Sequence, residues 1–328
     1  MTALVISVAL ALVFTFTNGF HDAANAIAVS IATRALKPAL ALTIAALGNL
    51  IGSFFGAKVA ATVGGGIIAL PTDSGVMLVV GAALVGAIGW NLLTWRFGLP
   101  SSSSHALIGG MVGATLPAGM TVLWDGVVTK VLVPMVLSPV VGFIAGYLVM
   151  LALMWTFRRV PPTRVRHGFR MAQAGSATAM AFGHGMQDAA KTMGIVVLAL
   201  NVAGVHSGQS IPLWVYLSCA GVLSIGTAAG GSRIMKTLGT KVTALDPPQG
   251  FAAELTGSAV LYGAAIGFGA PISTTHAISA AIMGVGATRR LSAVNWKVAV
   301  NMVKAWVFTF PGAGLLAAAC WGLGTLIF

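Results

Sequence analysis

The stretch NGFHDAANA, residues 18–26, places a histidine, an aspartate and two asparagines in an apolar run that extends from about residue 2 to residue 32. A second stretch, HGMQDAAKT at residues 184–192, interrupts a similar run between about residues 171 and 200. Asp22 and Asp188 belong to a set of only six acidic residues. Because a carboxylate within a membrane is costly, each of these two acids is a candidate functional residue.

The composition is that of a membrane protein. Of the 328 residues, 57% are hydrophobic and only 7% are charged, whereas soluble domains carry about 25% charged residues. The apolar runs are long and continuous, which predicts an all-α polytopic protein in a lipid bilayer rather than a β-barrel. In a soluble protein a net charge of +12 would suggest a nucleic-acid partner. Here the basic residues gather in loops between apolar segments, so we expect no nucleic-acid partner. Cys219 and Cys320 stand singly and form no disulfide or metal-binding pattern.

Two motifs occur twice and in the same order, which indicates an internal duplication. DAAN at residues 22–25 corresponds to DAAK at 188–191, and GLPSSSSHA at 98–106 corresponds to GAPISTTHA at 269–277. The chain therefore divides into a first repeat (1–157), a basic cytoplasmic loop (158–170) and a second repeat (171–328).

Each repeat contains about five apolar segments if the short segments after the two Pro-Ser motifs are counted, and an odd number inverts the second repeat relative to the first. The expected outer loops, about 64–74, 117–128, 201–210 and 269–275, hold no lysine or arginine, and two of them hold Asp73 and Asp125. This distribution predicts a multi-pass protein of the inner (plasma) membrane with an outer N-terminus. Whether the post-Pro segments span or re-enter stays open.

Inverted repeats with interrupted helices are the plan of secondary transporters, whose binding sites lie near the bilayer midplane. Gly19, Gly183 and Gly185 lie beside the two acid-containing motifs. We expect them to break the two spans, so that non-helical backbone lines a cavity. The alternative is that these glycines only allow close packing of helices.

Pro100 with the serines that follow it, and Pro271 with its Ser and Thr residues, are helix-start signals. A helix N-terminus carries free N–H groups and a partial positive charge, which favours anions. Two such starts, one per repeat, would flank a tetrahedral oxyanion; the alternative is a pair of polar caps without a ligand. His105 and His276 either carry protons or serve as packing residues. The candidate substrate-binding residues here are Ser102, Ser103, Ser104, Ser273, Thr274 and Thr275.

Asp22 and Asp188 do not attract an anion by themselves. They are candidates for cation or proton coupling, as is Glu254, the remaining intramembrane acid. The alternative is a structural pair with a buried basic residue. Lys191 stands where the first repeat has Asn25, and both are candidate substrate-binding residues. The lysine adds a fixed positive charge beside Asp188.

These motifs resemble the signature of the inorganic phosphate transporter (PiT) family, a Gly-x-Asn-Asp-x-x-Asn-Ala type sequence followed by Pro-x-Ser-x-Thr/Ser-His in each repeat. The resemblance covers nearly the whole chain and implies phosphate symport, a scaffold with a transport domain, and a homodimer. His21, Gln187 and Lys191 depart from the signature. The departures resemble the bacterial low-affinity, proton-linked branch, which takes phosphate or a neutral metal–phosphate complex. The resemblance carries phosphate and cation ligands onto Asp22, Asn25, Ser103, Ser104, Asp188, Thr192, Thr274 and Thr275.

We expect secondary active transport of inorganic phosphate coupled to a cation, with H⁺ favoured over Na⁺, without enzymatic activity and without a cofactor. A sulfate or other oxyanion permease on the same fold is the nearest alternative. A passive anion channel and an intramembrane hydrolase that would use a serine with His105 and Asp22 are further alternatives, although no nucleophile-elbow motif is present. The sequence assigns no metal ligands.

Overall fold

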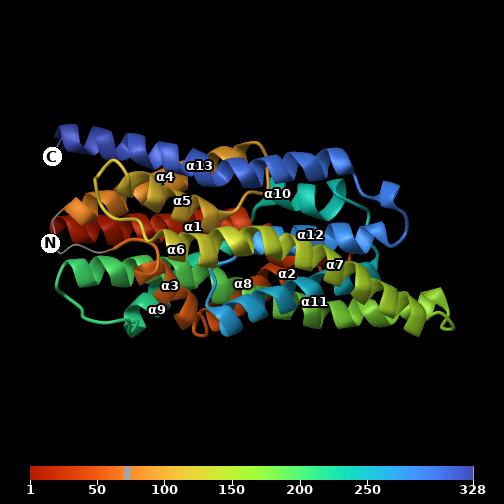
Figure 1. Cartoon of the computed structure of the whole chain (residues 1–328). Helices are drawn as coiled ribbons and strands as arrows, with labels where there is room; N and C mark the ends of the chain where they lie inside the picture. Colours follow the sequence, from red (N-terminus) through yellow and green to blue (C-terminus); the bar gives the residue numbers. More distant parts are fainter. Residues whose placement is uncertain (70–74, 328) are drawn as a thin grey trace.

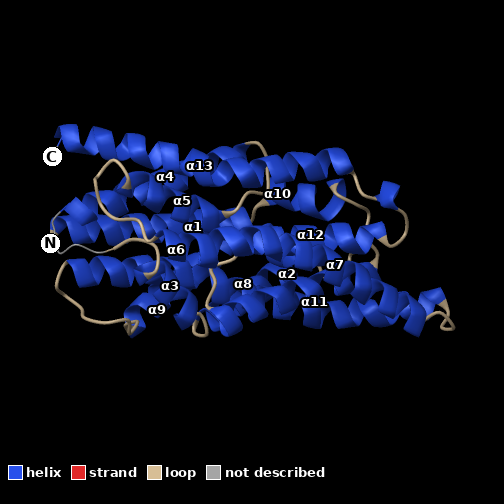
Figure 2. Cartoon of the chain, viewed as in Figure 1, coloured by secondary structure: helices blue, strands red, loops and turns tan. Residues whose placement is uncertain are grey.

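The computed structural model describes residues 1–69 and 75–327, which are built from helices without a β-strand (Figure 2). Five of the described helices are long and apolar enough to cross a membrane, and up to seven spans result if each of two bent helix pairs is one span. The predicted all-α, multi-pass architecture is therefore confirmed. Asp73, expected in an outer loop, lies outside the described residues.

The start of α1 and the end of α13 lie at one end of the molecule, and the loop between α7 and α8 lies at the other (Figure 1). The helices of the first half are α1 (Thr2–Ala32), α2 (Pro38–Ser53), α3 (Ala57–Gly65), α4 (Gly75–Arg96), α5 (Ser103–Thr115), α6 (Trp124–Val127), the π-helix η1 (Val128–Leu132) and α7 (Val133–Thr156). Those of the second half are α8 (Pro162–Val202), α9 (Leu213–Ala229), α10 (Ser232–Lys236), η2 (Thr237–Lys241), α11 (Pro247–Tyr262), η3 (Gly263–Phe268), α12 (Thr274–Ala287), η4 (Leu291–Ala293) and α13 (Trp296–Ile327).

The two acid-containing helices are continuous, so the expectation of breaks at their glycines is wrong. α1 and α8 run through residues 18–26 and 184–192 as α-helix. A Cβ on Gly19 would lie 2.5 Å from the carbonyl oxygen of Leu223, and one on Gly185 would lie 2.3 Å from that of Asn49. The glycines thus let α9 and α2 approach closely, which was the alternative interpretation. Bends occur elsewhere, at 68° between α2 and α3 and 63° between α9 and α10.

α5 and α12 are too short to cross a bilayer. α5 has 13 residues, about 20 Å at 1.5 Å per residue, which is less than the roughly 30 Å of a hydrocarbon core. It packs beside α4, and α12 packs beside α11. In Figure 1, α4 starts and α5 ends near the end of the molecule that carries both termini. By contrast, α11 starts and α12 ends near the opposite end. Each pair is therefore a re-entrant hairpin.

The turns of these hairpins lie inside the molecule. Ser101 and Ser102 are at most 1% exposed, and residues 269–276 are all buried. Residues 269–275, expected in an outer loop, are therefore buried instead. Of the two possibilities left open for the post-Pro segments, the structure favours re-entry. The physical reason is that each turn carries hydroxyls and free N–H groups that find partners in the protein interior.

Helices of one half cover the site-bearing helices of the other half. α2 packs on α8 while α9 packs on α1, and α7 packs on α12 while α13 packs on α5. The hairpin arms follow the same rule, since α4 contacts α13 and α11 contacts α7. This reciprocal exchange fixes α1, α8 and both hairpin turns at the centre of the molecule.

Candidate functional site

The N-termini of α5 and α12 meet at the centre of the fold. Ser102 caps α5 by accepting a hydrogen bond from the His105 amide, and Ser273 caps α12 in the same way from the His276 amide, both at 3.2 Å. The rings of His105 and His276 have centroids 4.8 Å apart. The predicted helix starts are thus present, and they direct two partial positive charges toward one region.

Asp22 lies beside the start of α5. Its Oδ1 is 2.8 Å from Nδ1 of His21, and its Oδ2 accepts a hydrogen bond from the Ser103 hydroxyl at 2.7 Å. The hydroxyl of Thr275, at the start of α12, donates to Oδ1 at 3.4 Å. His21 also contacts the Thr94 hydroxyl through Nε2 at 3.1 Å. One carboxylate therefore touches both hairpins.

Asn25 lies one turn after Asp22 on α1. Its amide nitrogen donates to the hydroxyls of Thr274 at 3.1 Å and Thr275 at 2.9 Å. Its Oδ1 is buried and has no partner among the described residues. The same holds for both amide atoms of Asn18, one turn before Asp22. Unpaired buried amides are rare in proteins, so these atoms indicate a place for a polar ligand.

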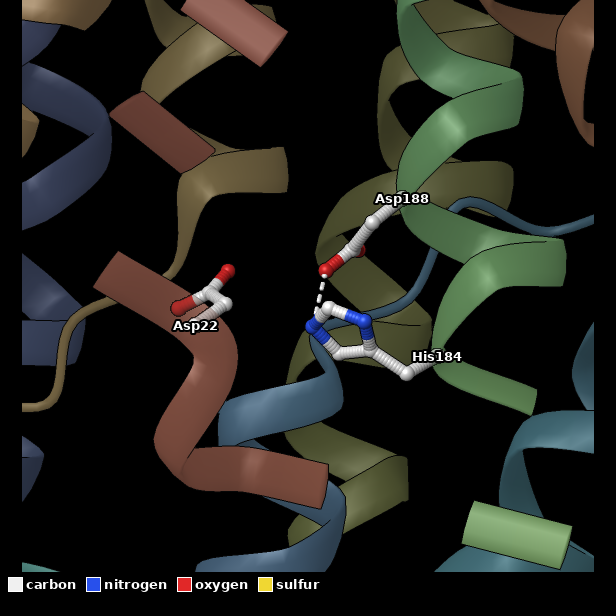
Figure 3. Close-up of side chains that lie close together, drawn as sticks. All are labelled: Asp22, His184 and Asp188. Atoms are coloured by element: carbon white, nitrogen blue, oxygen red, sulfur yellow. Dashed lines mark ion pairs between the residues drawn. The ribbon is translucent and has the colours of Figure 1, made fainter. Parts of the chain in front are cut away.

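Asp188 carries the second cluster of charge. Lys191 is 0% exposed; its ammonium group donates to Asp188 and, at 2.6 Å, to the Ser104 hydroxyl. His184 approaches the other Asp188 oxygen through Nε2 at 2.8 Å, as Figure 3 shows. The Nδ1 of His184 lies 2.9 Å from the Asn49 side-chain oxygen. Lys191 therefore links α8 to the start of α5.

The two clusters face each other across α1 and α8 (Figure 3). Asp22, His184 and Asp188 each offer a ligand atom, and these atoms lie within 4.8 Å of one another. The group has the geometry to hold a cation. Lys191 already occupies one Asp188 oxygen, so a metal ion would have to share that carboxylate with an ammonium group.

Sequence reasoning missed His184. The signal was its spacing from Asp188, because side chains at i and i+4 lie on the same face of a helix. Because we expected the helix to break at Gly185, we did not expect His184 and Asp188 to lie on the same helical face. Asn49 was missed as well, and nothing in its local sequence distinguishes it from a packing residue.

Two of the predicted site residues, Thr192 and Glu254, form hydrogen bonds to other helices rather than to the Asp22 and Asp188 clusters. The Thr192 hydroxyl accepts from Thr15 at 2.7 Å and ties α8 to α1. Glu254 belongs to a separate buried group on α11, where it accepts from Ser176 at 2.6 Å and from Gln173 at 3.4 Å. The structure brings the other candidates together around Asp22 and Asp188.

The turn of the second hairpin is held by α3. Lys58 donates from Nζ to the Ile266 carbonyl at 2.9 Å, and Thr62 donates from its hydroxyl to the Gly269 carbonyl at 2.8 Å. Gly269 has a φ of +58°, a conformation that favours glycine. These donors satisfy carbonyls that a helix C-terminus leaves free.

The turn of the first hairpin is held in the same manner by the second half. Arg233 donates to the Arg96 carbonyl at 2.7 Å, and Thr237 donates to the Gly98 carbonyl at 3.0 Å. Gly98 has a φ of +63°. A basic residue and a threonine one turn later therefore clamp each hairpin turn, always from the opposite half.

A family model described as the phosphate transporter family matches residues 18–317 of the chain. This range includes both acid-containing motifs and both Pro-Ser motifs. The chain belongs to the phosphate transporter family. The predicted resemblance is confirmed, and the family consists of transporters rather than enzymes, so the expectation of no enzymatic activity is confirmed as well.

Two relatives in this family match over nearly their full length. The chain is 47% identical over 326 residues to the "Probable low-affinity inorganic phosphate transporter" of Rhizobium meliloti (strain 1021), covering 98% of the chain and 96% of that protein. It is 40% identical to the protein of the same name from Bacillus subtilis (strain 168), covering 100% and 98%. A solved structure titled "The sodium-dependent phosphate transporter" is similar with a TM-score of 0.87 and 26% identity, over 100% of both chains.

Proposed function

We propose that this phosphate transporter family member is a secondary active transporter that carries inorganic phosphate across the cytoplasmic (inner, plasma) membrane. The two relatives named above are described as inorganic phosphate transporters, and the similar solved structure is that of a sodium-dependent phosphate transporter. Transport is coupled to a cation, with H⁺ favoured over Na⁺.

One observation carries the proposal: the starts of α5 and α12 converge on a buried group of hydroxyl and ammonium donors. The Ser104 hydroxyl and the Lys191 ammonium lie together at 2.6 Å, and the Asn18 amide has no partner among the described residues. Helix N-termini and an ammonium group together are suited to a phosphate anion. The proposed substrate-binding residues are Asn25, Ser103, Ser104, Lys191, Thr274 and Thr275. Ser102 and Ser273 support them as the N-caps of α5 and α12. Thr192 contributes by packing beside the site, where it bonds to Thr15.

The carboxylates favour phosphate over sulfate, the alternative substrate. A phosphate oxygen that carries a proton can donate a hydrogen bond to Asp22, whereas fully deprotonated sulfate cannot. A carboxylate without a proton to accept repels an anion. An excess of sulfate should therefore compete weakly with phosphate uptake.

Lys191 supports proton coupling. Its ammonium group gives Asp188 a permanent positive partner, the role that a bound Na⁺ would otherwise fill. Hard cations prefer oxygen ligands, and His184 offers a nitrogen at this point. Two carboxylates and one ammonium group meet at Asp22, Asp188 and Lys191, so a proton taken up by a carboxylate would lower the repulsion of an incoming anion. Glu254 is a second candidate for carrying a proton.

The same residues are also compatible with a metal–phosphate complex as the transported species. Asp22, His184 and Asp188 would hold the metal ion as cargo, and the helix starts would hold the phosphate. Uptake of a metal–phosphate complex predicts that a divalent chelator abolishes phosphate uptake, whereas free phosphate transport predicts no effect.

We also propose that residues 1–157 and 171–328 are inverted repeats joined by the basic loop 158–170, and that the protein is a homodimer. The reciprocal packing of the two halves supports the repeats. So do the clamps on the two hairpin turns, which pair Lys58 and Thr62 with Arg233 and Thr237.

Uptake of radiolabelled phosphate into proteoliposomes tests the proposal. An inward pH gradient without sodium should drive concentrative uptake, and external acidification should increase it. Absolute dependence on sodium at fixed pH would overturn proton coupling. Equilibration without accumulation under either gradient would identify a passive channel.

A further inference from the structure

A groove lies between α7 and α11, which pack side by side (Figure 1). Its cavity volume is about 810 Å³. Leu137 and Val141 line one wall, and Ala259 and Val260 line the other. Both helices belong to segments that can cross a membrane. An apolar groove in this position opens onto lipid chains.

One end of the groove is basic. Lys130 lines it and donates to the Phe268 carbonyl at 3.1 Å, which leaves two of its three N–H donors free for another acceptor. Trp124 precedes Lys130 by about 9 Å along the helical segment and is 51% exposed. Exposed tryptophans at the start of a span mark the headgroup level. A lysine just below that level reaches the headgroups with its ammonium group.

Two hydroxyls inside the groove lack partners. Ser138 and Thr256 line it from α7 and α11 and are 6% and 3% exposed. Neither hydroxyl has a hydrogen-bond partner among the described residues. Helical Ser and Thr usually bond to a carbonyl of the preceding turn, so two unpaired hydroxyls facing one groove point to an acceptor from outside the protein.

A counterpart groove lies between α4 and α13, with a cavity of about 460 Å³. Phe97 lines it as Phe268 lines the first groove, and Lys304 takes the place of Lys130. Trp296 begins α13 and is 44% exposed. Because α7 and α13 run in opposite directions (Figure 1), the two grooves face opposite leaflets.

We propose that each groove binds an anionic phospholipid, with its acyl chain between the helices and its phosphate at Lys130 or Lys304. In the α7–α11 groove the Ser138 and Thr256 hydroxyls lie among the apolar wall residues and can donate hydrogen bonds to an oxygen of the bound lipid. The apolar walls and the basic end match the acyl chain and the phosphate of that lipid.

The lipid would pack against residues that hold the phosphate site in place. This consequence rests on the proposed function. Ala270 and Ile272 form part of the groove, and their carbonyls accept hydrogen bonds from Gln187 at 3.2 Å and from Ser104 at 3.0 Å. In the other groove, Thr94 contacts His21 at 3.1 Å. A lipid chain against either hairpin turn therefore limits its movement.

Lipid retention tests the binding without any transport measurement. The full-length protein is incubated with an equimolar mixture of phosphatidylglycerol and phosphatidylcholine in detergent, repurified, and analysed by mass spectrometry. Lys130→Gln should weaken phosphatidylglycerol binding in the α7–α11 groove about five-fold, the effect of one lysine at a membrane surface. Because that variant leaves the α4–α13 groove unchanged, the double variant Lys130→Gln/Lys304→Gln should retain about five-fold less phosphatidylglycerol in total. Lys297→Gln, which changes an exposed lysine outside both grooves, should retain the wild-type amount.

Filling the groove separates this proposal from its alternatives. Ala259→Trp should lose the lipid of the α7–α11 groove, whichever its headgroup, while Leu148→Trp, on an exposed part of α7 outside the groove, should retain it. Ser138→Ala serves the same purpose if the tryptophan variant does not fold, and it should lower retention of both lipids. Unchanged retention in the folded groove variants overturns the proposal. A change from dimer to monomer in Ala259→Trp without loss of lipid overturns it too, and identifies a subunit interface.

Discussion

Lys191 on α8 donates a hydrogen bond from its ammonium group to the hydroxyl of Ser104 at the start of α5, over 2.6 Å. The same ammonium group binds Asp188. One side chain therefore joins the second acid-containing helix to the hairpin of the first half. No asparagine at position 191 could supply this charge, so the difference between the two halves is built into the centre of the site.

The first prediction concerns this lysine. Lys191→Asn leaves Asp188 buried without a positive partner, which costs about 3 kcal/mol or more. We expect phosphate affinity to fall by roughly a hundredfold, or uptake to become dependent on sodium. Proteoliposome uptake under pH and sodium gradients measures both. Lys297→Asn is the control, and wild-type kinetics in Lys191→Asn would leave the lysine without a role in transport.

The second prediction concerns Glu254. Glu254→Gln cannot release a proton, but it keeps one carbonyl oxygen that can accept from Ser176. If Glu254 carries the coupled proton, the variant loses net uptake driven by a pH gradient and retains exchange of external for internal phosphate. Parallel net-uptake and exchange assays on one preparation measure the two activities. Equal loss of both would assign Glu254 to the structure rather than to coupling.

The third prediction concerns a packing glycine. A Cβ on Gly226 would lie 2.4 Å from the Phe16 carbonyl oxygen, so α9 would have to move away from α1. We expect Gly226→Ala to lower the free energy of unfolding by about 1–3 kcal/mol. Gly221→Ala is the matched control on the same helix, because a Cβ there meets nothing within 4 Å. Thermal unfolding in detergent compares the variants; similar melting temperatures would contradict the close approach.

The fourth prediction concerns the clamp on the second hairpin. Thr62→Val removes the hydroxyl that donates to Gly269 at 2.8 Å. The loss of about 1 kcal/mol should speed hydrogen exchange at the hairpin turn by about fivefold. Thr43→Val is the control, since Thr43 bonds only within its own helix, to Ala39. Hydrogen–deuterium exchange with mass spectrometry detects the change, and equal protection in both variants would argue against a clamp.

The sequence by itself determined the class of protein and the location of its chemistry. The low charge content indicated a membrane protein. The repeated motifs predicted the N-termini of two helices, and these helices begin after Ser102 and Ser273 as expected. Asp22 and Asp188 stood out because acids are expensive in a membrane. These conclusions rest on local or compositional physics, which needs no knowledge of neighbouring helices.

Only the tertiary structure decided how these parts meet. Gly19 could break a helix or admit a neighbour, and the position of Leu223 on α9 settled the matter. The re-entry of α5 depends on hairpin turns that find partners in the interior, and the link from Lys191 to Ser104 joins residues far apart in the chain. Each outcome depends on a contact partner that the local sequence does not contain, which is why the chain alone left them open.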